Sequence, residues 1–215
     1  MKHQQIKKIT VLAMLCAFAY VAMYFLRIPV VAFLKYEPKD VIITLGGFLY
    51  GPLAAFIISV IVSFIEMLTA SETGWIGMIM NILSTCSFAC TAAFFYKKRR
   101  TLGGAITGLI VGTAIMVAVM LGWNYILTPL YMGQSRADIA AMLVPVFLPF
   151  NLIKGGLNAA FTALLYRPLV QGLRKAGLFP RSEGASAPNP GSKILFYGLA
   201  VVILLLSVGA IFLLS

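Results

Sequence analysis

The stretch 149–158 places polar side chains within an otherwise apolar part of the chain. Asn151, Lys154 and Asn158 lie three and four residues apart, so a helix would carry them on one face. An ionisable side chain inside a membrane span costs about 2.5–3.5 kcal/mol, and such residues mark functional sites by default. We therefore expect this face to supply hydrogen-bond donors to a polar ligand. The alternative is that it joins neighbouring helices, with Lys154 paired to Glu66.

A second cluster combines aromatic and polar side chains. Trp123, Asn124 and Tyr125 are followed closely by Thr128 and Tyr131. An aromatic belt at the membrane surface accounts for Trp123 and Tyr131 but explains Asn124 poorly. Aromatic planes beside amide donors suit a flat ligand that forms hydrogen bonds.

The composition indicates a membrane protein. Of 215 residues, 61% are hydrophobic and 11% are charged, against about 25% charged in ordinary soluble domains. These fractions exclude a soluble enzyme and a disordered chain. The net charge of +11 would suit nucleic acid in a soluble protein, but here it fits basic cytoplasmic loops. We expect the lipid bilayer as a partner, and no nucleic acid.

Common motifs of catalysis and ATP binding do not occur in the sequence. It contains no G-x-x-x-x-G-K-[ST], no H-E-x-x-H and no G-x-S-x-G. The three cysteines lie inside apolar runs, in neither a disulfide framework nor a metal-binding pattern. We therefore expect no enzyme activity, no metal site and no cofactor. If the protein is a transporter, the absence of an ATP-binding motif means that it takes its energy from partner subunits or works by facilitated diffusion.

The apolar runs predict an all-α membrane protein with six core helices, because about 20 apolar residues cross the hydrocarbon layer. We expect these helices, the second of them short, at residues 9–26, 41–50, 52–69, 74–96, 102–126 and 145–166. A charged outer loop over 27–40, which includes Asp40, joins the first two.

The C-terminal part differs in composition from the core. Residues 181–192 are rich in Ser, Gly, Ala, Pro and Asn, which is typical of a flexible linker. The uncharged apolar run 194–215 predicts an extra transmembrane helix. The expected units are a six-helix substrate-binding membrane domain at 1–178, a linker at 179–193 and the appended helix at 194–215.

The positions of Lys and Arg predict the orientation, because these residues favour cytoplasmic loops. With the N terminus inside, twelve of them are cytoplasmic and Lys154 lies within a helix. The remaining four are outside, at Arg27, Lys35, Lys39 and Arg136. We therefore expect a cytoplasmic N terminus.

Two helices carry small residues spaced four apart, which allow close helix approach. Ala13 and Ala17 form such a pair in the first helix, and Gly104, Gly108 and Gly112 form a longer series in the fifth. Packing within the bundle and docking of a partner are both compatible with these patterns.

Three motifs together resemble a known family. The first motif follows the first helix and reads Lys35-Tyr36-Glu37-Pro38-Lys39-Asp40. The second closes the fifth helix and combines Asn124-Tyr125 with Thr128-Pro129 and Tyr131. The third lies in the sixth helix and combines Pro149-Phe150-Asn151 with Lys154-Gly155 and Asn158. Over residues 5–178, the chain resembles the riboflavin-specific substrate-binding (S) component of energy-coupling factor (ECF) vitamin transporters. The linker and the seventh helix depart from the six-helix pattern of that family.

The resemblance implies a function in vitamin uptake. S components bind a vitamin at the extracellular side of the cell membrane, and the loop 27–40 would help to cover the pocket. They join a transmembrane coupling protein and two cytoplasmic ATPases, which supply the energy. In the family, a pair such as Ala13 and Ala17 faces the coupling protein.

The chemistry of riboflavin suggests roles for the polar residues. Its isoalloxazine ring offers carbonyls and an N–H group, and its ribityl chain offers hydroxyls. Amides both donate and accept hydrogen bonds, whereas a lysine only donates. We expect hydrogen bonds from Asn124, Asn151 and Lys154, further contacts from Thr44 and Asn158, and ring contacts from Tyr125, Tyr131 and Phe150.

Other functions stay open at this stage. The same architecture could serve thiamine, biotin or pantothenate, and these ligands differ from riboflavin in charge. An assembly subunit of a membrane complex would bind no small molecule. A small intramembrane enzyme would need a nucleophile, a base or a metal cluster, and the sequence offers none.

Overall fold

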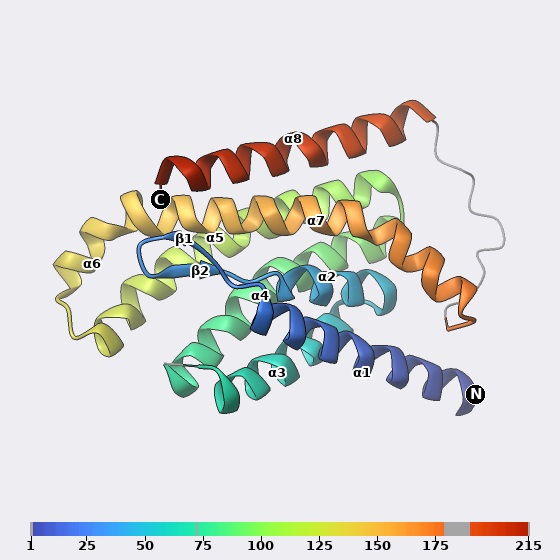
Figure 1. Cartoon of the computed structure of the whole chain (residues 1–215), viewed down its shortest axis with the longest axis horizontal. Coiled ribbons are helices and arrows are strands. Elements are labelled where there is room, and N and C mark those ends of the chain that lie inside the picture. Colours follow the sequence, from blue (N-terminus) through green and yellow to red (C-terminus); the bar gives the residue numbers. More distant parts are fainter. Residues whose placement is uncertain (1, 72, 179–189, 215) are drawn as a thin grey trace.

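Long helices lying side by side make up most of the molecule in the computed structural model (Figure 1). It describes residues 2–71, 73–178 and 190–214, with side chains at 4–71, 73–130, 132–178 and 197–213. The elements, in chain order, are α1 (Lys2–Phe25), β1 (Ile28–Val31), β2 (Leu34–Tyr36), α2 (Lys39–Tyr50), α3 (Pro52–Thr69), α4 (Gly74–Arg99), α5 (Leu102–Met132), α6 (Arg136–Met142), the π-helical segment η1 (Leu143–Phe147), α7 (Leu148–Lys175) and α8 (Pro190–Leu214).

Five helical stretches of the described chain are long and apolar enough to cross a membrane. They are Gln4–Phe25, Pro52–Thr69, Gly74–Arg99, Leu102–Leu130 and Arg136–Lys175. The predicted all-helical membrane architecture is therefore confirmed. The short helix α2 and the apolar part Tyr197–Leu213 of α8 fall below this length.

Small residues bring α4 and α5 together. A side chain on Gly108 would come within 2.6 Å of the Ala92 carbonyl oxygen, and one on Gly112 within 2.7 Å of the Phe88 carbonyl oxygen. Both carbonyls belong to α4, so the glycine series of α5 serves packing within the bundle. Of the two interpretations of the glycine series, packing within the bundle and docking of a partner, these contacts support packing.

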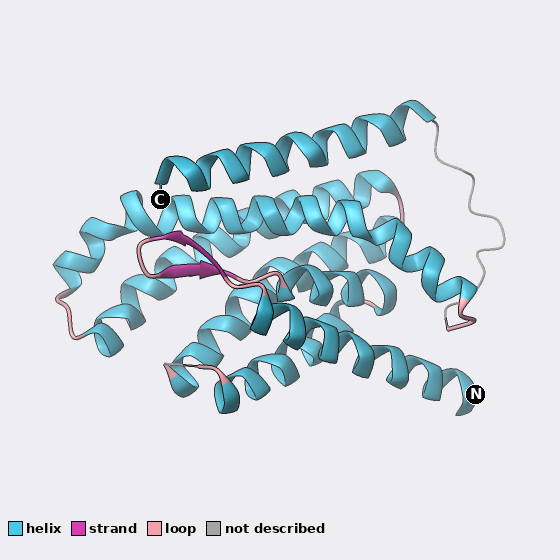
Figure 2. Ribbon diagram, in the orientation of Figure 1, coloured by secondary structure: helices cyan, strands magenta, loops and turns pink. Residues whose placement is uncertain are grey.

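The segment between α1 and α2 contains more structure than the predicted loop. β1 and β2 form an antiparallel hairpin in which Ile28 pairs with Tyr36 and Pro29 with Lys35 (Figure 2). The helix α2 then begins at Lys39, so Asp40 lies in its first turn and is buried. The prediction that Asp40 lies in an outer loop was wrong. A carboxylate near a helix N-terminus is stabilised by the helix dipole.

Two helices are longer than the expected ranges 102–126 and 145–166, and both continue through a proline. The helix α5 includes Pro129 and ends only at Met132, before Gly133, whose φ of 66° is left-handed. The helix α7 includes Pro168 and continues to Lys175, while α6 and η1 lead into it without a break. Proline is tolerated inside membrane helices because neighbouring helices and local adjustments satisfy the freed backbone groups.

The last helix, α8, lies along α7 (Figure 1). Ser207 of α8 packs where Gly156 of α7 has no side chain, and Ala200 of α8 shares a small hydrophobic cluster with Ala163 of α7. The helix begins at Pro190 rather than at 194. The predicted linker falls largely on residues 179–189, which lie outside the described residues.

Candidate functional site

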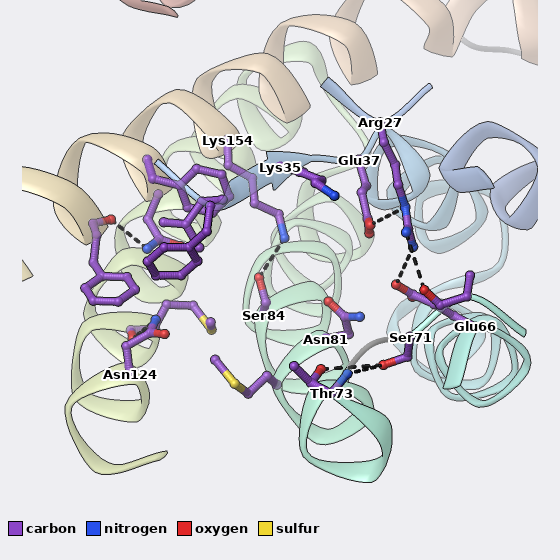
Figure 3. A pocket seen from close by; sticks show the side chains of 18 residues that line it. Arg27, Lys35, Glu37, Glu66, Ser71, Thr73, Asn81, Ser84, Asn124 and Lys154 are labelled. Carbon is purple, nitrogen blue, oxygen red and sulfur yellow. Dashed lines mark hydrogen bonds and ion pairs between the residues drawn. The ribbon is translucent and has the colours of Figure 1, made fainter. Parts of the chain in front are cut away.

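A cavity of about 250 Å³ lies at one end of the bundle, between the hairpin and the ends of α3, α4, α5 and α7 (Figure 3). In α4, Asn81 and Ser84 line the cavity, whereas the cluster Lys97–Arg100 marks the opposite end of that helix. The volume is close to the lower limit of about 300 Å³ that is common for small-molecule pockets. The cavity thus faces the end of the bundle that lies away from most of the basic residues.

Four of the predicted ligand contacts line this cavity: Asn124, Phe150, Asn151 and Lys154. The Asn124 amide donates to the Met120 carbonyl oxygen over 2.7 Å, and the Asn151 amide donates to the Phe147 carbonyl oxygen over 2.7 Å. Each bond lies within one helical stretch and fixes the direction of the side chain. Since an amide carries two N–H donors, each asparagine keeps one for a ligand.

The other predicted contacts are placed differently. Thr44 is buried, does not line the cavity, and donates to the Asp40 backbone carbonyl over 2.6 Å. Tyr125 is 40% exposed and does not line the cavity, and Asn158 lies buried behind the cavity wall. Tyr131 belongs to α5, but its side chain lies outside the described residues.

Four charged residues form a compact ionic cluster at the rim of the cavity, and Figure 3 shows three of them, Arg27, Glu37 and Glu66. Arg27 contacts Glu37 at 3.0 Å and Glu66 at 3.4 Å, and Lys39 contacts Glu37 at 2.7 Å. Lys39 also pairs with Glu66. Buried charges are stable only when paired, and here two cations face two carboxylates. The hairpin, α2 and α3 are therefore joined at this point.

Lys154 pairs with Asp40 instead of Glu66. Its ammonium nitrogen lies 3.1 Å from Asp40 Oδ2 and donates to Ser84 Oγ over 3.1 Å. The predicted alternative of a Lys154–Glu66 pair was therefore wrong. Sequence reasoning missed it because it had placed Asp40 in a solvent-exposed loop.

The Asp40 carboxylate accepts two further hydrogen bonds. Thr85 Oγ1 donates to Asp40 Oδ1 over 2.6 Å, and Asn158 Nδ2 donates to Asp40 Oδ2 over 3.2 Å. Asn158 in turn accepts a hydrogen bond from the Tyr36 hydroxyl over 3.0 Å. Burial raises the pKa of the Tyr36 phenol, and the nearby Asp40 carboxylate raises it further. Tyr36 therefore remains a protonated donor.

Several lining residues were not among the predicted contacts. Asn81 and Ser84 line the cavity, and Thr85 lies one residue further along α4. Their spacing of three and four residues places them on one face of an apolar span, which is the same signal that identified Lys154. Arg27 and Glu37 also line the cavity, but the sequence shows no link between the hairpin and the ends of the helices.

Two further predictions concern surfaces and metals. Ala13 and Ala17 are exposed on α1, so they are not used for packing within the described bundle, and a role in binding a partner stays a prediction. Among the described residues there is no group of three His, Cys, Asp or Glu side chains that could hold a metal ion.

Comparisons with known proteins agree on one family. A family model described as "ECF transporter, substrate-specific component" matches residues 7–166. The chain is 34% identical over 181 residues to the riboflavin transporter RibU of Staphylococcus aureus (strain TCH60), covering 80% of this chain and 95% of that one. It is 28% identical over 187 residues to the riboflavin transporter FmnP of Bacillus subtilis (strain 168), covering 80% and 98%.

The fold points to the same family. A solved structure described as the S component of a bacterial ECF transporter matches with a TM-score of 0.67 and 32% sequence identity. The match covers 79% of this chain and 99% of that one. Members of this family are membrane subunits of transporters and not enzymes. The chain belongs to the family of substrate-specific components of ECF transporters.

Proposed function

We propose that this chain binds riboflavin in the described cavity and serves as the riboflavin-specific subunit of an ECF importer. The observation that carries the proposal is the convergence of three buried donor side chains, Asn124, Asn151 and Lys154, on one cavity. The names of the RibU and FmnP relatives support the same ligand. Donors at fixed positions provide specificity in an otherwise apolar pocket.

Aromatic side chains complete a site for a flat ring. Phe33, Phe147 and Phe150 all line the cavity, and the rings of Phe33 and Phe147 meet edge to face with centroids 6.2 Å apart. Aromatic faces favour offset stacking on another ring. The isoalloxazine ring of riboflavin would lie against these side chains, while its carbonyls and hydroxyls face the amides and Lys154.

Charge favours riboflavin over thiamine. Among the described residues around the cavity, each carboxylate is paired with a cation, and Lys35 is left without an ion pair. The cation of thiamine would find no unpaired carboxylate when it leaves water, whereas riboflavin is uncharged. Biotin and pantothenate carry a carboxylate that Lys35 could pair with, so for these two vitamins the names of the relatives, and not the charge, favour riboflavin.

The energy for uptake comes from other subunits in this proposal. The sequence has no ATP-binding P-loop, so two cytoplasmic ATPases and a transmembrane coupling protein would drive transport. Ala13 and Ala17 would face the coupling protein. The chain would lie in the cell membrane with its N terminus in the cytoplasm and the cavity open to the outside, since the basic residues gather at the other end.

A titration with riboflavin tests the proposal. The purified protein should quench riboflavin fluorescence, and Lys154→Met should weaken binding roughly tenfold or more, because a hydrogen bond to a charged donor is lost. Lys98→Met, at the opposite end of α4, is the matched control and should bind like the wild type. Excess thiamine, biotin or pantothenate should not displace the flavin. A folded wild-type protein that does not bind riboflavin would refute the proposal and favour an assembly subunit.

A further inference from the structure

Asp40 lies behind the cavity wall and reaches the cavity only through other side chains. It is 0% exposed and does not line the cavity. Its carboxylate accepts from Thr85 and Asn158 and pairs with Lys154. A carboxylate has about four acceptor sites, so three partners nearly saturate it. Asp40, which belongs to α2, therefore has fixed neighbours on two other helices, α4 and α7, and no direct contact with a ligand in the cavity.

Lys154 has one hydrogen left for the cavity. Its ammonium group has three N–H donors, of which one points to Asp40 and one to Ser84. Lys154 is 9% exposed and lines the cavity, so the remaining donor has access to a ligand. The ammonium group of a lysine lies at the end of a flexible four-carbon chain, so its position varies unless partners hold it. The direction of the free donor is thus set by Asp40 and Ser84.

Asp40 is itself held from the hairpin side. Asn158 donates to Asp40 through its nitrogen and accepts from the Tyr36 hydroxyl through its oxygen. This orientation leaves the Asn158 amide no freedom to turn over, because the two bonds need opposite ends of the group. Tyr36 is almost fully buried in β2. A continuous chain of contacts therefore runs from the hairpin through Asn158 and Asp40 to Lys154.

We propose that Asp40 is a positioning residue for ligand binding, which holds the Lys154 ammonium at the cavity wall, and that Tyr36 and Asn158 fix Asp40 in this role. The inference rests on the proposed function and deepens it. Asn158, whose position in the sequence suggested a ligand contact, is separated from the ligand by Asp40 and Lys154. Because the cost of reorienting Lys154 is met before binding, the network raises affinity by preorganisation.

A double-mutant cycle on riboflavin affinity tests the proposal. Asp40→Asn keeps the shape of the side chain and removes its charge, so it should weaken binding roughly tenfold in the wild-type background. In the Lys154→Met background, the same change should alter affinity less than about twofold, because Asp40 acts only through Lys154. Equal losses in both backgrounds would mean a general structural role and would overturn the proposal. Size-exclusion profiles establish that each variant is folded.

A second variant keeps the test independent of a change in buried charge. Tyr36→Phe removes one hydroxyl at the far end of the network and should weaken binding about threefold, with the loss again absent in the Lys154→Met background. Tyr96→Phe is the matched control, since Tyr96 Oη contacts Tyr166 Oη at 2.5 Å, away from the cavity. Unchanged affinity in Tyr36→Phe would remove the hairpin from the network. A wild-type protein without riboflavin affinity would instead refute the proposed function itself.

Discussion

Glu66 shows how single residues set the properties of the site. Its side chain is 4% exposed and contacts both Arg27 and Lys39. The removal of one partner from a buried ion pair leaves the other charge without compensation, which costs more than the pair itself contributes. Glu66 thus stabilises the junction between the hairpin, α2 and α3 in addition to lining the cavity.

We expect Glu66→Gln to lower the free energy of unfolding by about 3 kcal/mol, because two cations then share Glu37 alone. Thermal unfolding in detergent measures this loss. The double variant Glu66→Gln/Lys39→Met removes one charge of each sign and should recover part of the stability. A double variant whose loss equals the sum of the single losses would contradict the coupling between these two residues.

At this scale, sequence reasoning found the residues that line the cavity better than their partners. Lys154 and Asn124 stand out because polar groups are costly inside apolar runs. Asp40 did not stand out, since a charge beside a charged loop appears exposed until the fold is known. Its neighbours Thr85 and Asn158 are 45 and 118 residues away in the sequence, and nothing local indicates such a contact.

At the scale of elements, the helices could be predicted and their ends could not. The long apolar runs identified the helices because the hydrocarbon layer requires about 20 such residues. The expected ends at 126 and 166 are too early, because α5 continues through Pro129 and α7 through Pro168, which membrane helices tolerate. The hairpin was missed because its strands are only four and three residues long.

The outward face of α1 carries a prediction of its own. Ala13 and Ala17 are exposed and leave room for close approach of another helix. We expect Ala13→Leu/Ala17→Leu to abolish riboflavin uptake by cells that contain the whole transporter, while the purified variant keeps its riboflavin affinity. Uptake of labelled riboflavin, beside a titration, measures both. Leu53→Phe on the outward face of α3 is the control, and uptake by the alanine variant at the wild-type rate would exclude this face as the docking surface.

At the scale of the whole molecule, α8 lies outside the lining of the cavity and packs against α7 and the hairpin. None of the described residues that line the cavity belongs to α8, and the family model matches only residues 7–166. The helix nevertheless packs closely on α7 through Gly156 and Ser207. It therefore contributes to stability more than to ligand recognition.

A chain shortened to residues 1–178 should keep its affinity for riboflavin within about twofold and unfold at a lower temperature, because α7 loses its contacts with α8. Fluorescence titration and thermal unfolding test the two statements separately. A folded shortened chain that has lost its affinity would show that α8 belongs to the binding unit.

The most direct test of the riboflavin site is the visible spectrum of the purified protein. The chain should be produced in a host that contains riboflavin and purified in mild detergent. We expect a yellow protein with a flavin absorption spectrum and near-stoichiometric riboflavin, which is released when the protein is denatured. A colourless, folded protein that also fails to quench added riboflavin would contradict the account.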